Sequence, residues 1–286
     1  MKLAIIEFLL VLLLAASTFK LFAQKPARLI IRGDDMGYSH SGNQALIKCA
    51  KAGIQSSIEI IVPSPWFPEA VKLLNENPGL DVGVHLAITS EWDNVKWRPV
   101  SDCPSLKDED GYFYPMISKN ANYPNRSVSE NKWTLADLEK EFRAQIELAK
   151  KKLPGITHVS AHMGCTSLSD SSRALVKRLV VEYGIDIDLE QAGVKYTTYK
   201  GAHKTGVEKI KSFIAMLDDL KPGETYLFVD HPGLDSPELR AISHIGYEDV
   251  AADRQGVTDL FTSRLVKEAL AKKGIDVISY AQVKNP

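Results

Sequence analysis

Short runs of β-branched and other apolar residues alternate with longer helical patterns along most of the chain, and this alternation constrains the fold more than any other feature. The strand-like runs lie at 27–32, 56–62, 81–87, 158–162, 185–189, 224–229 and 276–280. The helical patterns lie at 43–52, 66–77, from Thr134 onward, and at 170–183, 207–220 and 259–272. Regular alternation predicts a parallel sheet, and about seven units favour a distorted TIM-type (β/α) barrel over an open sheet.

Residues 24–286 are expected to form a single domain, because neither an internal repeat nor a low-complexity linker divides them. The segment from about 88 to 132 differs from the rest of the chain. It has no steady hydrophobic period and is rich in Pro, Asn, Ser and aromatic residues. Structureless segments of this length are uncommon inside compact domains and are usually functional, so we expect a long functional loop here.

Residues 1–23 have the layout of a secretory signal peptide. Lys2 opens a short charged region, Leu3–Ala16 is almost continuously apolar, and Ala23 provides a small residue at the cleavage point. A retained membrane anchor is the alternative, but about 14 apolar residues are fewer than the roughly 20 that a spanning helix needs. We therefore expect a secreted or periplasmic protein without a membrane partner after cleavage.

The charge balance and the cysteines exclude several classes of protein. The chain has a formal net charge of −1 at pH 7 and no block of basic residues, so a nucleic-acid partner is not expected. Nothing in the pattern specifies an oligomeric state. Cys49, Cys103 and Cys165 are an odd number without paired spacing. They exclude a disulfide scaffold and a cysteine zinc cluster but permit a single disulfide.

Ionisable residues lie at the carboxyl ends of four predicted strands. Asp34 and Asp35 follow the first strand, His85 lies near the end of the third, His162 ends the fourth, and His231 follows the sixth. Because the carboxyl ends of parallel strands form one rim, we expect these side chains to meet. One carboxylate with two imidazoles is a common ligand set for a catalytic divalent metal. A second carboxylate and a further histidine could then serve as base and acid.

Each of these residues also has a simpler explanation. A pair of aspartates after a strand often caps the next helix, and a histidine in an apolar run is often a hydrogen-bonded core residue. His231, which precedes Pro232-Gly233, could belong to an ordinary turn. However, the chain has only 7 histidines, and three of them fall at predicted strand ends. The joint pattern therefore favours a metal-dependent hydrolase.

Four blocks of sequence extend this interpretation. They are Ile30–Gly37 (Ile-Ile-Arg-Gly-Asp-Asp-Met-Gly), Pro78–Leu86, Thr157–His162 and His231–Gly233. Together they resemble the motifs of the YdjC-like carbohydrate deacetylases, the chitooligosaccharide deacetylase family, and the resemblance spans essentially the whole chain after residue 23. It implies a hydrolase that removes N-acetyl groups from amino sugars or acetylated oligosaccharides.

The resemblance also implies a role for each site residue. Asp35, His85 and His162 match the family's metal ligands. Asp34 matches its general base, and His231 matches the histidine thought to protonate the departing amine. Zinc is the first choice on ligand type, whereas Mg, Mn, Fe, Co or Ni would be alternatives at a site with carboxylate and imidazole ligands.

The fourth-strand block departs from the family pattern. Family members usually read Thr-His-x-Asp-Ser-His-x-His here. In this chain Ser160 and Ala161 replace the Asp-Ser pair and Gly164 replaces the last histidine, while His162 is retained. The loss of hydrogen-bonding partners around a metal ligand weakens its orientation and tuning.

Aromatic residues in the long loop have two interpretations. They could stack on sugar rings or form a small core under the loop, and the same choice applies to Trp66, just after the second predicted strand. The loop residues concerned are Trp92, Trp97, Tyr112, Phe113, Tyr114 and Tyr123. Two other functions also stay open. One is a metal hydrolase of another amide or ester, and the other is a non-catalytic glycan-binding protein, against which the presence of all five site residues argues.

Overall fold

The computed structural model describes residues 25–185 and 187–283, so the expected signal peptide at 1–23 lies outside the described residues. The strands form one sheet in which all neighbours run parallel. Its order is β4-β3-β2-β1-β6-β5, and β7 pairs with the start of β1. The strands are β1 (Arg28–Met36), β2 (Ser57–Ile60), β3 (Val82–Leu86), β4 (His158–Ala161), β5 (Lys195–Thr197), β6 (Thr225–Asp230) and β7 (Asp276–Val277).

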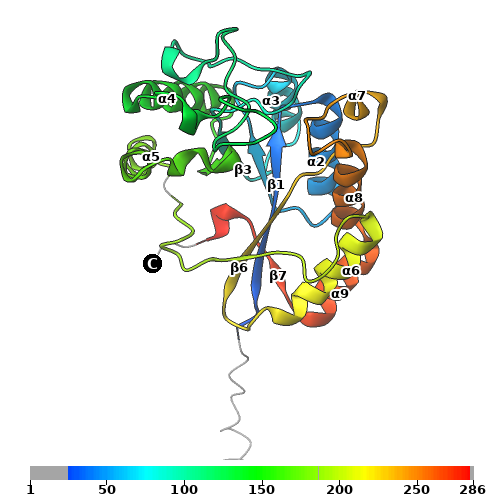
Figure 1. Ribbon diagram of the computed structural model, residues 1–286. Helices are drawn as coiled ribbons and strands as arrows, with labels where there is room; N and C mark the ends of the chain where they lie inside the picture. Colours follow the sequence, from blue (N-terminus) through cyan, green and yellow to red (C-terminus); the bar gives the residue numbers. More distant parts are fainter. Residues whose placement is uncertain (1–24, 186, 284–286) are drawn as a thin grey trace, which may run out of the picture.

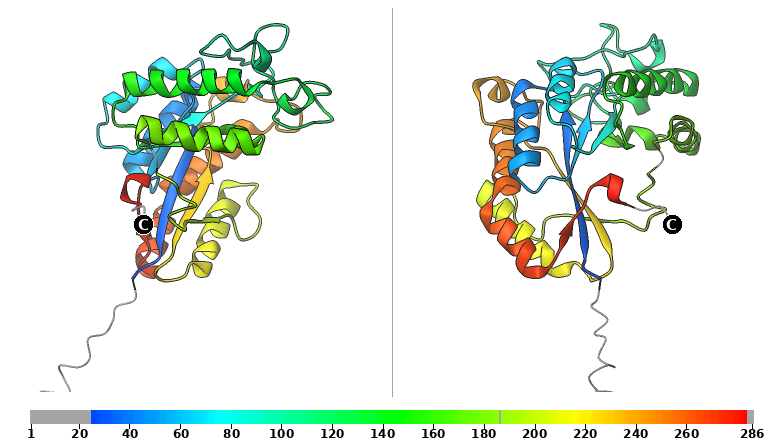
Figure 2. Two further views of the ribbon diagram at one scale, coloured as in Figure 1. Left: turned by 90° about the vertical axis from the view of Figure 1, so that its left-hand side faces the viewer. Right: turned by 180° about the vertical axis from the view of Figure 1, so that it is seen from behind.

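The sheet curls, with helices packed around its outer side (Figures 1 and 2). Within the described residues no pairing joins β4 to β5, so the sheet is a half-barrel. The expected parallel, barrel-like α/β fold is confirmed. The helices are α2 (His40–Ala52), α3 (Phe67–Asn75), α4 (Leu135–Lys152), α5 (Asp170–Tyr183), α6 (Gly206–Met216), α7 (Pro237–Arg240), α8 (Val250–Thr262) and α9 (Arg264–Lys273).

Capping residues explain where several helices begin and end. Thr134 accepts a hydrogen bond from the backbone of Asp137 and starts α4. Ser169 and Ser172 form a reciprocal capping box at the start of α5. The same helix ends at Gly184, whose φ of 64° lies in the left-handed region that glycine adopts without strain. As a result, α5 has the bounds that the sequence predicts.

Two large apolar clusters hold the helices against the sheet. One joins β2 and β3 to the helices around α3, α4 and α5, and it includes Val84 and Phe142. The other joins β1 and β6 to α6, α8 and α9, and it includes Leu29, Phe228 and Phe261. All five of these side chains are 1% exposed or less. The helices therefore fix the backbone of the strands that carry the expected site residues.

The predicted strand at 185–189 is wrong. Its described residues do not form a strand, and the corresponding edge strand is β5, at Lys195–Thr197. Ile187 and Leu189 instead pack against a small cluster around Ile30 and Leu227. The apolar run therefore indicates correctly that these side chains pack against the core. However, their backbone does not pair with the sheet.

Two further boundaries near the carboxyl end differ from the prediction. The helical pattern at 259–272 is two helices, α8 and α9, which meet at Ser263, whose ψ of 128° interrupts the helix. The predicted strand at 276–280 pairs only at Asp276–Val277. Tyr280 lies in a short 3-10 turn and is 2% exposed. The Tyr280 ring is therefore buried, as the apolar pattern indicates, although position 280 does not belong to a strand.

The segment between β3 and α4 contains only two 3-10 turns, Pro104–Leu106 and Val128–Glu130. Four of its aromatic residues, Trp92, Trp97, Phe113 and Tyr123, are at most 5% exposed. Trp92, Trp97 and Phe113 belong to the apolar cluster that includes Val84 and Phe142, and none of the four rings offers a free face to a sugar. Tyr112 and Tyr114 are half-buried, and Trp66 is 40% exposed.

Two other sequence expectations concern cysteines and membranes. Cys49, Cys103 and Cys165 are all buried and unpaired, so the permitted disulfide does not form in this structure. Across the part of the chain that the structure describes, none of the helices has both the length and the apolar character needed to cross a bilayer.

Candidate metal centre

A bulge in β1 carries both aspartates. Gly33 of β1 pairs with Ile58 and Met36 pairs with Ile60, so Asp34 and Asp35 together face the single residue between those partners in β2. Asp35 has a φ of 71°, in the left-handed region that non-glycine residues seldom occupy. Bulges of this kind redirect side chains and are frequent beside functional sites. Here the bulge brings both carboxylates close to His85, and both are at most 3% exposed.

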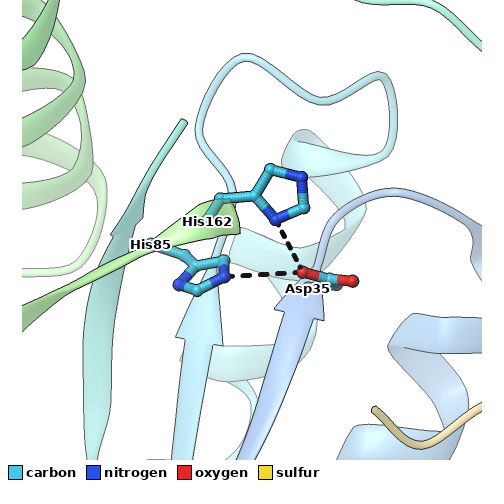
Figure 3. A group of neighbouring side chains, drawn as sticks. All are labelled: Asp35, His85 and His162. Carbon is cyan, nitrogen blue, oxygen red and sulfur yellow. Dashed lines mark ion pairs between the residues drawn. The ribbon is translucent and has the colours of Figure 1, made fainter. Parts of the chain in front are cut away.

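Asp35, His85 and His162 converge as the sequence predicts (Figure 3). Oδ1 of Asp35 lies 3.5 Å from Nε2 of His85 and 3.2 Å from Nδ1 of His162. One ligand atom from each residue lies within 4.8 Å of the others. Among the described residues, this buried Oδ1 atom has no hydrogen-bond partner. An unpartnered carboxylate oxygen between two ring nitrogens fits a single divalent cation.

The remaining nitrogen of each histidine has a defined partner. Nδ1 of His85 lies 2.6 Å from Oγ of Ser160, and Nε2 of His162 lies 3.0 Å from Oε2 of Glu91. Glu91 is 5% exposed and lies in the segment after β3. Histidines that bind metals usually donate their other N–H to such an acceptor, which fixes the ring and its tautomer. Both rings are therefore held in orientations suited to a metal.

Arg254 of α8 is a site residue to which the sequence patterns assigned no role. Its Nη2 donates to Oδ2 of Asp35 at 2.9 Å. The guanidinium carbon lies 4.4 Å from the ring centre of Tyr38 and 5.1 Å from that of Trp92. An arginine in a helix gives no local signal of such a contact. Glu91 likewise looks like an ordinary loop residue, so neither contact was predicted.

The charges around the centre shift the pKa values of its groups in opposite directions. Burial alone would raise the pKa of Asp35, but the positive charges of His231, Arg254 and His162 outweigh it and hold that pKa well below its usual range. Burial lowers the pKa of His85 to about 4. Burial also disfavours charge on His162, yet Glu91 and Asp35 raise its pKa to about 10. The two imidazoles thus lie in electrostatically different environments.

Asp34 lies beside the three converging residues in a rigid ion pair. Nε and Nη2 of Arg32 donate to its two oxygens at 2.7 and 2.8 Å, and Nη1 of Arg32 donates to the hydroxyl of Tyr280 at 2.8 Å. Oδ2 of Asp34 lies 3.7 Å from Nε2 of His85. The bidentate contact fixes the plane of the carboxylate.

His231 follows β6 and lies at the open side of the centre. Its Nε2 is 3.8 Å from Oδ2 of Asp35, and its side chain is 39% exposed. Its Nδ1 is 3.6 Å from Oδ1 of Asp230, while Oδ2 of Asp230 accepts a hydrogen bond from the hydroxyl of Tyr199. Partial shielding from solvent would lower the pKa of His231, but the charge of Asp35 and the contact with Asp230 raise it above its ordinary value.

Comparisons with known proteins identify the family and the relatives of this chain. The profile of the family described as YdjC-like protein matches residues 28–272. A carbohydrate deacetylase of Thermus thermophilus is 31% identical over 238 residues, which cover 75% of this chain and 80% of the relative. A carbohydrate deacetylase of Brevibacillus brevis is 24% identical over 90% of this chain and 99% of the relative.

A solved structure supports the same fold. It is an Enterococcus faecalis protein named for cellobiose-phosphate cleavage, with a TM-score of 0.70 and 24% identity. The superposition covers 90% of this chain and 98% of that chain. Because the family profile spans most of the chain, the chain belongs to the YdjC-like protein family.

Proposed function

We propose that this protein is a metal-dependent carbohydrate deacetylase that removes N-acetyl groups from amino sugars or acetylated oligosaccharides. The observation that carries the proposal is the convergence of Asp35, His85 and His162 on one point, with Oδ1 of Asp35 left without a hydrogen bond among the described residues. The names of the relatives supply the substrate class. An acetylated sugar is accordingly the proposed partner.

Asp35, His85 and His162 would hold the metal. When bound, a divalent ion supplies Lewis-acid polarisation of the acetyl carbonyl, which is a weak electrophile in an amide. Zinc suits one carboxylate with two imidazoles, and Mg, Mn, Fe, Co or Ni are the alternatives. Elemental analysis of the purified protein identifies the ion.

Asp34 and His231, which both lie beside the converging residues, would transfer protons. The ion pair with Arg32 holds the Asp34 carboxylate beside the metal ligands, where it would accept the proton of the attacking water. His231 lies on the more exposed side, and the charge of Asp35 and the contact with Asp230 raise its pKa, which favours its protonated form. It would donate that proton to the departing amine, because an unprotonated amine is a poor leaving group.

The substrate would approach from the side of His231. Its side chain is 39% exposed, whereas those of Asp34, Asp35 and His85 are 4% exposed or less. Because the deeper residues are shielded, the acetyl group would enter past His231 and the sugar would remain near the surface. Trp66, which is 40% exposed, is an aromatic face available to a sugar ring.

A substrate screen tests the proposed activity directly. Acetate release is measured from acetylated mono- and oligosaccharides, with metal-stripped protein and after the addition of each candidate divalent ion. Simple amides and activated esters are included as comparison substrates. Release from sugars that requires a metal supports the proposal. Faster turnover of the simple amides or esters would identify a different metal hydrolase, and binding of sugars without turnover would identify a glycan-binding protein.

The proposed location is outside the cytoplasm, in the periplasm or the medium. The support is the pattern of residues 1–23, a charged start followed by an apolar run and a small residue. Fractionation of cells that express the full chain, followed by amino-terminal sequencing, tests this. A mature protein that begins near Gln24 outside the cytoplasm is the expected result, and an intact amino terminus in the cytosol would contradict it.

A further inference from the structure

The inner faces of β2, β3 and β4 carry a buried polar cluster that connects to His85. Strand register brings its members together: Glu59 of β2 pairs with Gly83 of β3, Gly83 also pairs with His158 of β4, and His85 pairs with Ser160. Glu59 and His158 are completely buried. Buried charges are costly unless they are paired, so a cluster at this place requires a specific arrangement of hydrogen bonds.

Gly83 leaves the space that this cluster occupies. A Cβ atom at Gly83 would collide with Nε2 of His158 and Oε2 of Glu59. A glycine inside a buried strand also loses packing and backbone entropy relative to alanine. The carboxylate of Glu59 and the ring of His158 occupy the space that a side chain at position 83 would need.

The hydrogen-bond directions follow from which groups carry a proton. Nε2 of His158 donates to Oε1 of Glu59 at 2.6 Å, and the hydroxyl of Ser160 donates to Oε2. Burial alone would raise the pKa of Glu59, but the contact with His158 and the charge of Arg32 lower it to about 2. The carboxylate is therefore ionised and accepts both hydrogen bonds.

This direction determines the tautomer of His85. A hydroxyl has one hydrogen, and Ser160 gives it to Glu59. The Ser160 oxygen can then only accept at the 2.6 Å contact with Nδ1 of His85, so Nδ1 must carry the hydrogen. Nε2, which faces Asp35 at 3.5 Å, is left with its lone pair free. That is the form of a histidine that binds a metal through Nε2.

We infer that Glu59 is a positioning residue that acts through Ser160 to hold His85 in its metal-binding tautomer. The inference rests on the proposed metal centre. It also explains the departure of this chain at position 160, where family members usually carry an aspartate. In this chain the negative charge lies on β2, on the other side of β3 from Ser160, and the serine hydroxyl connects it to the imidazole.

Zinc affinity tests the inference without any measurement of activity. Competition with a chelating dye gives the dissociation constant of the metal-stripped protein and its variants. Glu59→Gln and Ser160→Ala should each weaken zinc binding by about 10–100-fold, as losses of such outer partners usually do. Ser57→Ala is the matched control, because Oγ of Ser57 lies 3.5 Å from Nε2 of His158 and its removal leaves the Ser160–His85 contact intact. Its zinc affinity should match that of the wild type.

A rescue variant separates positioning from general damage. Ser160→Asp alone would put a second carboxylate against Glu59, and the repulsion should lower stability and zinc affinity. In the Glu59→Gln background the same change restores a single carboxylate next to Nδ1 of His85, so zinc affinity should recover. Opposite effects of Ser160→Asp on zinc affinity in the two backgrounds support the action of Glu59 through Ser160. A Ser160→Asp change that fails to restore affinity in the folded Glu59→Gln protein would overturn it, as would wild-type affinity in Glu59→Gln itself.

Nitrogen NMR of the metal-free protein gives a readout that does not depend on zinc. In ¹⁵N-histidine-labelled protein, His85 should carry its proton on Nδ1, and Ser160→Ala should shift the population toward the Nε2–H form. If the wild type bound no zinc, the proposed metal centre would be wrong. The tautomer of His85 would still show whether Glu59 acts on it through Ser160. An Nε2–H tautomer in the metal-free wild type would overturn the inference.

Discussion

Nη2 of Arg254 donates a hydrogen bond to Oδ2 of Asp35 at 2.9 Å, so helix α8 contacts the bulge of β1 inside the proposed metal centre. Both side chains are 4% exposed or less. The other carboxylate oxygen of Asp35 faces the two histidines. One carboxylate is therefore shared between a permanent cation on one side and the proposed metal on the other.

Replacing Arg254 should reduce stability most in the metal-free protein. Arg254→Met leaves the buried Asp35 without its permanent cation, and breaking a buried pair typically costs about 3–5 kcal/mol of the free energy of unfolding. Bound zinc should restore part of this loss, because it supplies positive charge to the same carboxylate. Urea unfolding with and without zinc measures both values. Arg264→Met, at a side chain that is 86% exposed, is the control. If Arg254→Met lowered the free energy of unfolding equally with and without zinc, the two cations would not share the Asp35 carboxylate.

The purified protein should bind about one divalent ion per chain, and His85→Ala or His162→Ala should abolish binding or nearly so. Each change removes one of three ligand atoms that lie within 4.8 Å of each other. Elemental analysis after dialysis gives the occupancy. His203→Ala, at an exposed histidine that is not one of the three converging residues, should retain the metal. Full occupancy in both ligand variants would exclude this ligand assignment.

The two neighbouring aspartates should behave differently when changed. Asp34→Asn should keep the metal but lower kcat by about 10²–10⁴, since it removes the proposed base. Asp35→Asn should also lose the metal, because Oδ1 of Asp35 is the atom between the two histidines. Metal content and turnover of each folded variant are compared side by side. Indistinguishable variants would mean that the division of roles is wrong.

His231→Ala should lower kcat for an N-acetyl sugar by roughly 10² or more and leave the metal content unchanged. An activated ester should lose much less, because its leaving group needs no proton. A proton donor is active below its pKa, so kcat/KM should fall as pH rises through the raised pKa of His231, and this fall should disappear in the variant. An amide rate close to wild type would make His231 a structural part of the turn, with Asp34 returning the proton to the amine.

Glu59 should make the metal-free protein sensitive to acid. Its pKa is lowered from 4.5 to about 2, so its contribution to stability is present above pH 4.5 and is lost as pH falls toward 2. The stability difference between wild type and Glu59→Gln should therefore shrink over that interval. Urea unfolding at pH 6 and pH 3 measures it, with Glu76→Gln at an exposed site as control. A difference that stays constant with pH would refute the low pKa.

Local sequence patterns were sufficient for the fold class and for the main convergence. Alternating strand and helix periods imply a parallel sheet, and the carboxyl ends of its strands must share one rim. For this reason Asp35, His85 and His162 could be grouped from their positions at the carboxyl ends of three predicted strands, and the structure brings them together. The predicted bounds of α5 hold for a local reason as well, because its caps Ser169 and Gly184 act on backbone groups only a few residues away.

Other features depended on contacts between distant residues. The hydrogen bond between Arg254 and Asp35 spans 219 positions, and the one between Ser160 and Glu59 spans 101. Neither pair leaves a local trace, because a hydrophobic period reports whether a side chain is buried and not which partner it meets. The error at 185–189 has the same cause: its apolar residues are buried by packing, while sheet pairing passes to Lys195–Thr197. The sequence by itself determined the parallel α/β fold and which strands carry the proposed site residues. Only the tertiary structure decided which side chains bind those residues, because the energies of these contacts depend on atoms that folding brings together.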